Sequence, residues 1–459
     1  MVDSTRSFDE KRARGRRSGG PELNRRRLLG GVLGASAVSL VSPLLGSCGP
    51  TPSTSSAVPA RPYWFPSYTG DEIMDSQVLW YLGQAGQGLT DVLECLSAAA
   101  KIEGGNEASW FSAWLDLAKR VQARSDSHLA NGHRQSAGTS LLRASNYYRA
   151  ALIHYPEPTD PRLLEATSES DAAFHRALEL LGVPGRAVQI PYEATTLPGT
   201  FFTSPAATGR APTLIVHQGF HAFPEETMWV VQGAMARGYH CLLFHGPGQG
   251  LVLRQQALPF RADWERVVTP VVDFAVAQPE VDPARLTLKG LSFGGALAPR
   301  AAAFEPRLKA LVANPGVLDW HSAMMRKLSE FPGLESLSTT SPETFDASVG
   351  FIVQGSAAAR WWFKDAMWKH GATSPSDLLA KLRAFNNQDI VGRITCKVLV
   401  MDGTAEEFSV GEAKRLYDAL STEKTYLLFD ETDTGLLHCQ AGALLVAQER
   451  MFDWLDEHV

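Results

Sequence analysis

Short strand-forming runs alternate with helical stretches along the chain after Pro184, and this alternation constrains the fold more than any other feature. Leu214, Ile215 and Val216 form a continuous apolar run, which is typical of a strand buried on both faces. We therefore expect an α/β fold in which helices cover both faces of a mostly parallel central sheet. The strand-forming runs are residues 188–192, 213–216, 240–244, 286–288, 310–313, 397–401 and 425–429.

Two regions lack this strand signal. Between residues 75 and 181, apolar side chains such as Trp110 and Trp114 recur at helical spacing. We therefore expect an N-terminal helical cap region over residues 63–184 and a catalytic α/β domain over residues 185–459. Within that domain, residues 320–393 are rich in aromatic residues and methionine, which predicts a helical insertion that serves as a lid or cap.

Residues 1–47 have the composition of an export signal. A basic stretch leads to three arginines at 25–27 and then to a mildly apolar run, an order that resembles a twin-arginine signal. Residues 45–48 read Leu-Gly-Ser-Cys and resemble a bacterial lipobox, so Cys48 is the expected lipid attachment site. Residues 48–62, rich in Pro, Ser and Thr, suit a flexible tether. We expect a protein lipid-anchored at the outer face of a bacterial cytoplasmic membrane; the alternatives are a transmembrane anchor and a cytoplasmic enzyme.

Charge and cysteine usage narrow the possible partners. Residues 1–47 carry nine basic and four acidic side chains, so their removal changes the net charge from −6 to −11 and disfavours nucleic acid as a partner. The cysteines after Cys48 form no CxxC pair and lack zinc-site spacing. We expect neither a metal nor an organic cofactor. The sequence leaves the oligomeric state open.

One motif is typical of a nucleophilic serine. Residues 290–294 read Gly-Leu-Ser-Phe-Gly and lie between a strand-like and a helix-like segment, a context that carries more weight than the pattern itself. The glycines permit a strained turn that presents the Ser292 hydroxyl at the edge of the sheet. The amide of Phe293 would face a developing oxyanion, and a second amide is expected near Gly219 or Phe220, after the strand at 213–216.

A serine hydroxyl needs a base that takes its proton, and His438 is the best placed of the twelve histidines. It lies between the expected strand at 425–429 and a C-terminal helix. Cys439 beside it is expected to be a buried thiol and not a nucleophile.

The supporting acid should follow the strand at 397–401, where Asp402, Glu406 and Glu407 are all candidates. Position alone does not decide among them. We favour Glu406, because a carboxylate farther along the loop can reach His438, whereas Asp402 can hold the turn at the strand end.

A Gly-rich turn at residues 245–250 lacks the lysine and spacing of a phosphate-binding P-loop. We expect a tight strand-end loop at the rim of the pocket.

Together these residues resemble a known group: the cap-bearing α/β hydrolases that include dihydroxypseudooxynicotine hydrolase and the fungal enzymes that shorten polyketide chains. The resemblance spans roughly residues 75–459 and implies an α/β-hydrolase fold with a helical N-terminal region packed over the active site. It is carried by residues 142–149, 196–199, 246–250, 263–265, the serine motif and His438-Cys439.

Matched motif by motif, the family's serine and histidine fall on Ser292 and His438. Its acid, usually an Asp two residues before a Phe, falls on Glu406, two residues before Phe408. A second departure is His245, where the family usually has Asp. Some members of the group hydrolyse a carbon–carbon bond beside a ketone.

The expected function is that of a serine hydrolase with an oxyanion hole, acting on a small aromatic or acyl substrate at an ester or at a carbon–carbon bond beside a ketone. Two alternatives use the same fold. One is an exopeptidase or aminoacyl hydrolase, and the other is a non-catalytic binding protein tethered to the cell surface.

Overall fold

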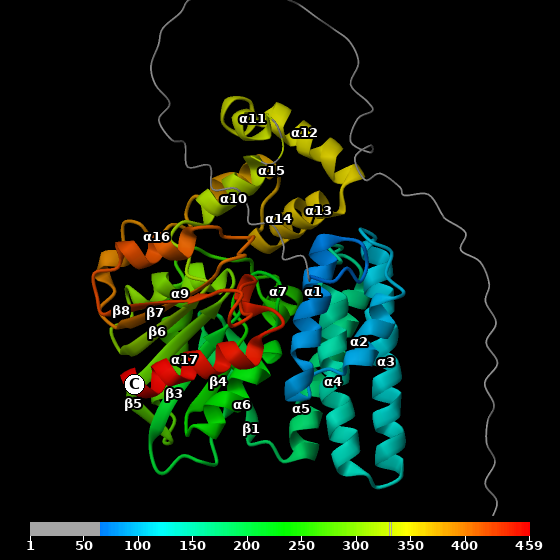
Figure 1. Cartoon of the computed structure of the whole chain (residues 1–459), viewed down its shortest axis with the longest axis vertical. Helices are drawn as coiled ribbons and strands as arrows, with labels where there is room; N and C mark the ends of the chain where they lie inside the picture. Colours follow the sequence, from blue (N-terminus) through cyan, green and yellow to red (C-terminus); the bar gives the residue numbers. More distant parts are fainter. Residues whose placement is uncertain (1–64, 330, 332) are drawn as a thin grey trace, which may run out of the picture. The chain divides into compact units, whose positions relative to one another are not determined.

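The computed structural model describes residues 65–329, 331 and 333–459, and these residues form an eight-stranded sheet of order β1-β2-β4-β3-β5-β6-β7-β8 (Figure 1). β2 pairs antiparallel with β1 and β4, and every other neighbouring pair is parallel. The predicted mostly parallel sheet is therefore confirmed. The strands are β1 Gly185–Tyr192, β2 Thr195–Phe202, β3 Ala211–His217, β4 His240–Phe244, β5 Val281–Leu291, β6 Leu308–Asn314, β7 Lys397–Gly403 and β8 Lys424–Phe429.

The central strands are buried on both sides, as the apolar run at 214–216 predicts. Leu214 and Val216 pack with helices α6 and α17, whereas Ile215 packs with α8, α9 and α16 on the opposite face. This division follows from the two-residue repeat of side-chain direction in a strand. The helices of the α/β part are η2 Pro224–Thr227, α6 Met228–Ala236, α7 Gly250–Gln256, α8 Glu265–Val276, α9 Gly294–Ala302, α16 Glu412–Ala419, η5 His438–Gln440 and α17 Leu444–His458.

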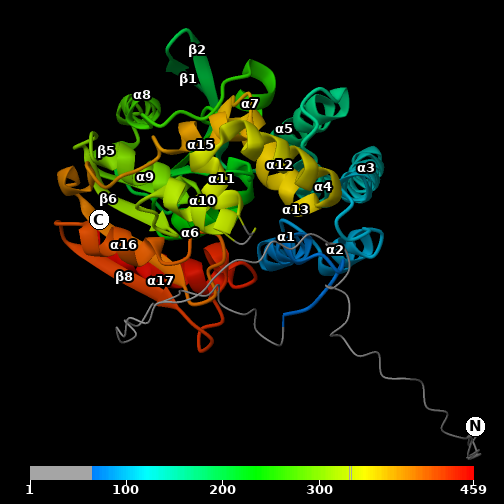
Figure 2. The same cartoon turned by 90° about the horizontal axis from the view of Figure 1, so that it is seen from above.

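Helices also occupy the N-terminal part that the structure describes, and both views place them beside the sheet (Figures 1 and 2). The buried side chains of Trp110 and Trp114 lie on one face of α3, and Trp110 Nε1 donates to Ala150 O at 2.7 Å. The Asn106 side chain caps the start of this helix. The helices are α1 Glu72–Gly83, η1 Ala85–Gln87, α2 Val92–Ala99, α3 Glu107–Ala130, α4 Arg134–Ile153 and α5 Pro161–Leu181.

A second helical group lies between β6 and β7 in the sequence, although these two strands are neighbours in the sheet. Its buried aromatic and aliphatic side chains join the same apolar core as α8, α9 and α16. Figures 1 and 2 show helices α10 to α15 together at one end of the sheet. The helices between β6 and β7 are α10 Trp320–Ser329, α11 Leu334–Thr340, α12 Pro342–Gly355, α13 Ala357–Arg360, the π-helical turn η3 Trp361–Asp365, α14 Ala366–His370, α15 Pro375–Leu382 and, directly before β7, η4 Val391–Arg393.

Strand β2 is absent from the strands that the sequence predicts. Pro198 and Gly199 lie in its middle, and both residue types weaken a strand signal. Both fit here: Pro198 O accepts from His245 N, and a Cβ at Gly199 would lie 2.4 Å from Leu243 O, so only glycine allows this approach to β4. Pairing with β4, which is distant in the sequence, therefore determines that this segment forms a strand.

The export signal at 1–47, the tether at 48–62 and the lipid site Cys48 lie outside the described residues, and the domain boundaries stay predictions. Among the residues that the structure describes, no helix combines the length and the apolar character needed to cross a membrane.

Candidate active site

Ser292 lies on a sharp turn between β5 and α9. Its φ of 59° is in the left-handed region, which is a strained conformation for a residue other than glycine. The turn is held because Ser292 N donates to Asn314 O at 2.6 Å and Gly295 N donates to Ser292 O at 2.7 Å. A Cβ at Gly290 would lie 2.0 Å from Gly294 O, so the turn requires glycine there. The serine is thus presented at the carboxyl end of a central strand.

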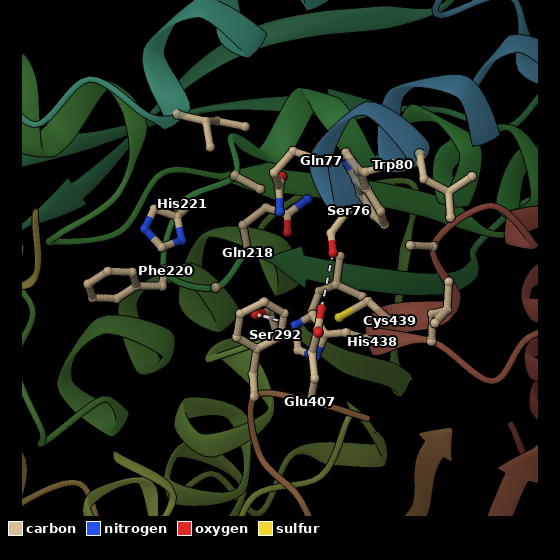
Figure 3. A pocket seen from close by; sticks show the side chains of 18 of the residues that line it. Ser76, Gln77, Trp80, Gln218, Phe220, His221, Ser292, Glu407, His438 and Cys439 are labelled. Atoms are coloured by element: carbon tan, nitrogen blue, oxygen red, sulfur yellow. Dashed lines mark hydrogen bonds between the residues drawn. The ribbon is translucent and has the colours of Figure 1, made fainter. Parts of the chain in front are cut away.

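His438 lies between Ser292 and Glu406. His438 Nε2 is 2.9 Å from Ser292 Oγ, and His438 Nδ1 is 2.7 Å from Glu406 Oε2 and 2.9 Å from Glu406 Oε1. Figure 3 shows the contact of serine and histidine at the wall of the cavity. The three side chains come from β5–α9, the loop after β7 and η5, which meet at the carboxyl ends of neighbouring parallel strands.

Glu406 is held rigidly. Its Oε1 accepts hydrogen bonds from the amides of Phe408 and Ser409 at 2.8 and 2.9 Å. Burial alone would raise the pKa of this carboxyl, but His438 and these two amides outweigh burial and lower it. Glu406 is therefore an anion that faces the histidine.

The other two candidate acids have different partners. Asp402 accepts from the Tyr426 hydroxyl at 2.7 Å and from its neighbouring amide of Gly403, and burial raises its pKa to about 6. Glu407 accepts from Ser76 Oγ at 3.1 Å and lines the cavity (Figure 3). Among the described residues, Glu406 is the carboxylate that hydrogen-bonds His438.

The environment of His438 favours its protonated form. Burial opposes that form, but the neighbouring Cys439 and the Glu406 carboxylate favour it, so the pKa of His438 is raised well above its ordinary value. The ring of Phe408 packs against the imidazole with 4.7 Å between ring centroids.

The expected oxyanion donors lie around Ser292. Gly219 and Phe220 follow β3 and line the cavity with Ser292. A Cβ at position 219 would lie 2.6 Å from Phe293 N, so glycine leaves that amide uncovered. The Phe293 ring is buried and packs on Trp320 at 4.6 Å, which leaves its amide as the group that can act at the site.

Gln249 braces this loop, a role that the sequence analysis did not assign. Its Nε2 donates to Gln218 O and to Gly219 O, the latter at 3.2 Å, and its Oε1 accepts from Gly246 N at 3.1 Å. The Gly-rich turn at 245–250 is thus a tight strand-end loop whose glutamine holds the chain beside the serine. The motif was visible in the sequence, but this contact depends on the pairing of β3 with β4.

Replacing Gln249 with alanine is expected to lower kcat about 100-fold with little change in KM, because the amides of the loop then lose their fixed direction. Steady-state kinetics on an activated ester would measure the effect. Gln255→Ala, at an exposed position of α7, is the matched control. An unchanged kcat in Gln249→Ala would contradict the bracing role.

The cavity at Ser292 has a volume of about 100 Å³. Helix α1 contributes Ser76, Gln77 and Trp80, and η3 contributes Trp361 and Trp362. Figure 3 shows the α1 side chains facing the serine and histidine across the cavity. Nothing local in the sequence identifies these wall residues, because they come from segments that only the tertiary fold brings together.

A buried ion pair within the insertion is joined to the loop after β3 through His221. Asp365 Oδ2 lies 2.6 Å from Lys369 Nζ and 2.7 Å from His221 Nε2, and His221 stacks on Trp361 at 4.3 Å. Burial would raise the pKa of Asp365, but Lys369 and His221 lower it to about 2. The cluster orders the wall next to Phe220.

Cys439 is buried, and its thiol donates to Asn314 O at 3.5 Å, as expected of a structural thiol. Within the described ranges, no three histidine, cysteine or acidic side chains are grouped so that they could hold a metal ion.

Comparison with known proteins identifies relatives of this chain. The profile of the prolyl oligopeptidase family matches residues 226–350. Hydrolase LUC6 from Fusarium is 34% identical over 388 residues, which cover 79% of this chain and 91% of that protein. The 20-hydroxy-prefusarin hydrolase FUS2 from Gibberella moniliformis is 33% identical over 387 residues, which cover 80% of this chain and 91% of that protein.

A solved structure, that of 2,6-dihydroxy-pseudo-oxynicotine hydrolase, has the same fold, with a TM-score of 0.64 at 19% identity over 82% of this chain and 95% of that chain. The fold and the long sequence matches lead to the same family assignment that the sequence motifs predict. The chain belongs to the α/β-hydrolase superfamily, in the cap-bearing group that includes these fungal hydrolases.

Proposed function

We propose that this hydrolase uses Ser292 as its nucleophile, His438 as general base and acid, and Glu406 as the group that orients the histidine. The observation that carries the proposal is the continuous set of contacts from Glu406 through His438 to Ser292 at the wall of a cavity. A neutral His438 that donates from Nδ1 to Glu406 has Nε2 free to accept the serine proton.

The reaction follows from this arrangement. Ser292 Oγ attacks a substrate carbonyl carbon while its proton passes to His438 Nε2, and the amides of Phe293 and of Gly219 or Phe220 stabilise the oxyanion. The bond to the leaving group then breaks, and the leaving group takes the proton from His438. The acyl group stays on Ser292 Oγ as an acyl-enzyme. Water, deprotonated by the same histidine, then releases the acid and frees Ser292.

Two kinds of carbonyl substrate fit the proposal: an ester, and a ketone whose neighbouring carbon–carbon bond is cleaved. The mostly apolar cavity wall favours a small aromatic or acyl group. Product analysis by mass spectrometry on matched ester, β-diketone and aminoacyl substrates tests the assignment. Release of a carboxylic acid from the ester or diketone is expected, and turnover of the aminoacyl substrate alone would contradict it.

A second candidate is an exopeptidase or aminoacyl hydrolase. The match of residues 226–350 to the prolyl oligopeptidase family favours it, and the same three side chains serve acyl transfer from an amide. The non-catalytic binding protein with this fold is the remaining alternative, and it requires a folded chain whose serine is unreactive.

The pH profile follows from the raised pKa of His438. The base must be neutral to accept a proton, so kcat/KM is expected to rise with pH along a limb above about 6.5, the ordinary histidine value. Initial rates on an ester of pH-independent reactivity, measured from pH 5 to 10, would locate this limb. A limb below pH 6.5 would contradict the charge environment assigned to His438.

We further propose that the chain is exported and anchored through a lipid on Cys48, which the sequence alone supports; the relatives named above are fungal. Expression of the full chain in a bacterial host with radiolabelled palmitate tests this. Label in the membrane fraction that Cys48→Ser abolishes is expected, and an unlabelled chain in the cytoplasmic fraction would contradict it.

A further inference from the structure

A second cavity lies within the insertion, and its volume of about 220 Å³ exceeds the roughly 100 Å³ at Ser292. Its wall is mostly apolar, with both aliphatic and aromatic side chains, and it also includes the charged residues Glu72, Lys327 and Glu407. Helix α10 contributes Met324 and Leu328, and α15 contributes Leu378, Leu379 and Leu382, all of them buried. We call this cavity the distal chamber.

The distal chamber adjoins the cavity at Ser292. Five residues line both, and Figure 3 shows two of these, Phe220 and Glu407, beside the serine and histidine. A ligand that enters one cavity therefore contacts the wall of the other. The shared residues are Phe220, Trp320, Trp362, Glu407 and Phe408.

His370, which also lines the chamber, supplies an independent observation. Among the described residues neither ring nitrogen has a hydrogen-bond partner, although the side chain is buried. The ring is surrounded by phenylalanine rings, with centroids 5.1 Å from Phe385, 5.3 Å from Phe260 and 5.7 Å from Phe220. A buried polar group without a partner costs stability, so its presence points to a ligand.

The charge state of His370 fixes the kind of partner. Burial and the Lys369 charge lower the pKa of His370 to about 3, so the ring is neutral near pH 7. A neutral imidazole has one N–H donor and one acceptor nitrogen, which match a ketone or hydroxyl oxygen.

We propose that the distal chamber binds an elongated, uncharged acyl arm of the substrate, with His370 hydrogen-bonded to an oxygen along that arm. The inference rests on the proposed function, because it places the scissile carbonyl at Ser292. It names the substrate class: an acyl compound whose apolar arm is longer than the serine cavity can hold and carries a keto or hydroxyl group.

The test compares p-nitrophenyl acetate with p-nitrophenyl octanoate. The wild-type protein is expected to prefer octanoate by about 100-fold in kcat/KM, because each buried methylene adds to binding of the transition state. Ala358→Trp, which fills the chamber from α13, is expected to reduce this preference about tenfold or more and to leave acetate turnover within about threefold. Ala347→Trp, at an exposed position of α12, is the matched control.

Turnover of the acetate ester distinguishes failure of the distal chamber from failure of the proposed serine hydrolase activity. Loss of the octanoate preference in Ala358→Trp but not in Ala347→Trp, with acetate still hydrolysed, supports the chamber. Equal turnover of both esters by the wild type, or an equal change of both in Ala358→Trp, overturns the chamber while the serine hydrolase stands. If folded wild-type protein hydrolyses neither ester, the proposed function fails first. Met324→Trp, from α10, repeats the test should Ala358→Trp not fold.

His370→Phe tests the oxygen contact. The variant keeps a ring of similar size among the phenylalanines, so a plain octanoate ester is expected to be hydrolysed as before. A set of keto-octanoate esters, with the ketone at successive carbons, is expected to include one that loses about tenfold in kcat/KM. If every keto ester changes by the same factor as plain octanoate, the role of His370 is overturned.

Discussion

Replacing Ser292 with alanine is expected to lower kcat by roughly 10,000-fold or more, and His438→Ala is expected to have an effect of the same size. In the proposed mechanism the two side chains share one proton transfer, so loss of either stops formation of the acyl-enzyme. For the same reason the double variant is expected to be no worse than the single variants, because residues that act as one unit are not additive. Pre-steady-state release of p-nitrophenol from a p-nitrophenyl ester would show whether the rapid initial burst that marks acyl-enzyme formation disappears.

Ser336→Ala, at an exposed position of α11, is the matched control for the serine variant, and thermal unfolding checks that each variant is folded. Retention of more than about one tenth of the activity in purified Ser292→Ala would contradict the proposed nucleophile, provided that the residual activity shares the substrate preference of the wild type.

Glu406→Gln is expected to lower kcat by about 1,000-fold to 10,000-fold. The amides of Phe408 and Ser409 both donate to Glu406 Oε1, so a glutamine must place its oxygen there and turn its NH₂ group toward His438 Nδ1. That NH₂ group selects the tautomer whose proton is on Nε2. A histidine in this tautomer cannot accept the proton of Ser292.

Asp402→Asn is the control for this prediction, because Asp402 was the competing candidate and contacts Tyr426 instead of the histidine. We expect it to change kcat less than tenfold. The nitrogen-15 shifts of His438 would report the tautomer in each variant. A large loss in Asp402→Asn together with a small loss in Glu406→Gln would reverse the assignment of the acid.

Local patterns in the sequence predict the sharp turn that carries Ser292, because the causes of this turn are local. Glycines beside Ser292, a strand before it and a helix after it are all readable within about fifteen residues. His438 and Glu406 are predictable one step further, since parallel strands end at a common edge and their loops converge there. The family resemblance adds the position of the acid, although this chain has Glu where the family usually has Asp.

Features that depend on long-range contacts were not predictable from the sequence. The bracing contact of Gln249 requires β3 and β4 to lie side by side. Strand β2 forms despite Pro198 because it pairs with β4. The walls of both cavities come from α1 and the insertion, whose contact with the serine has no local signature. The isolated nitrogens of His370 are likewise visible only in the folded chain.

The most direct test of Ser292 as an activated nucleophile is covalent labelling with a fluorophosphonate probe, followed by intact mass measurement and peptide mapping. We expect one adduct per chain, located on Ser292, that is lost in Ser292→Ala and strongly reduced in His438→Ala. A well-folded wild-type protein that takes up no label, or carries the label on another residue, would contradict the account.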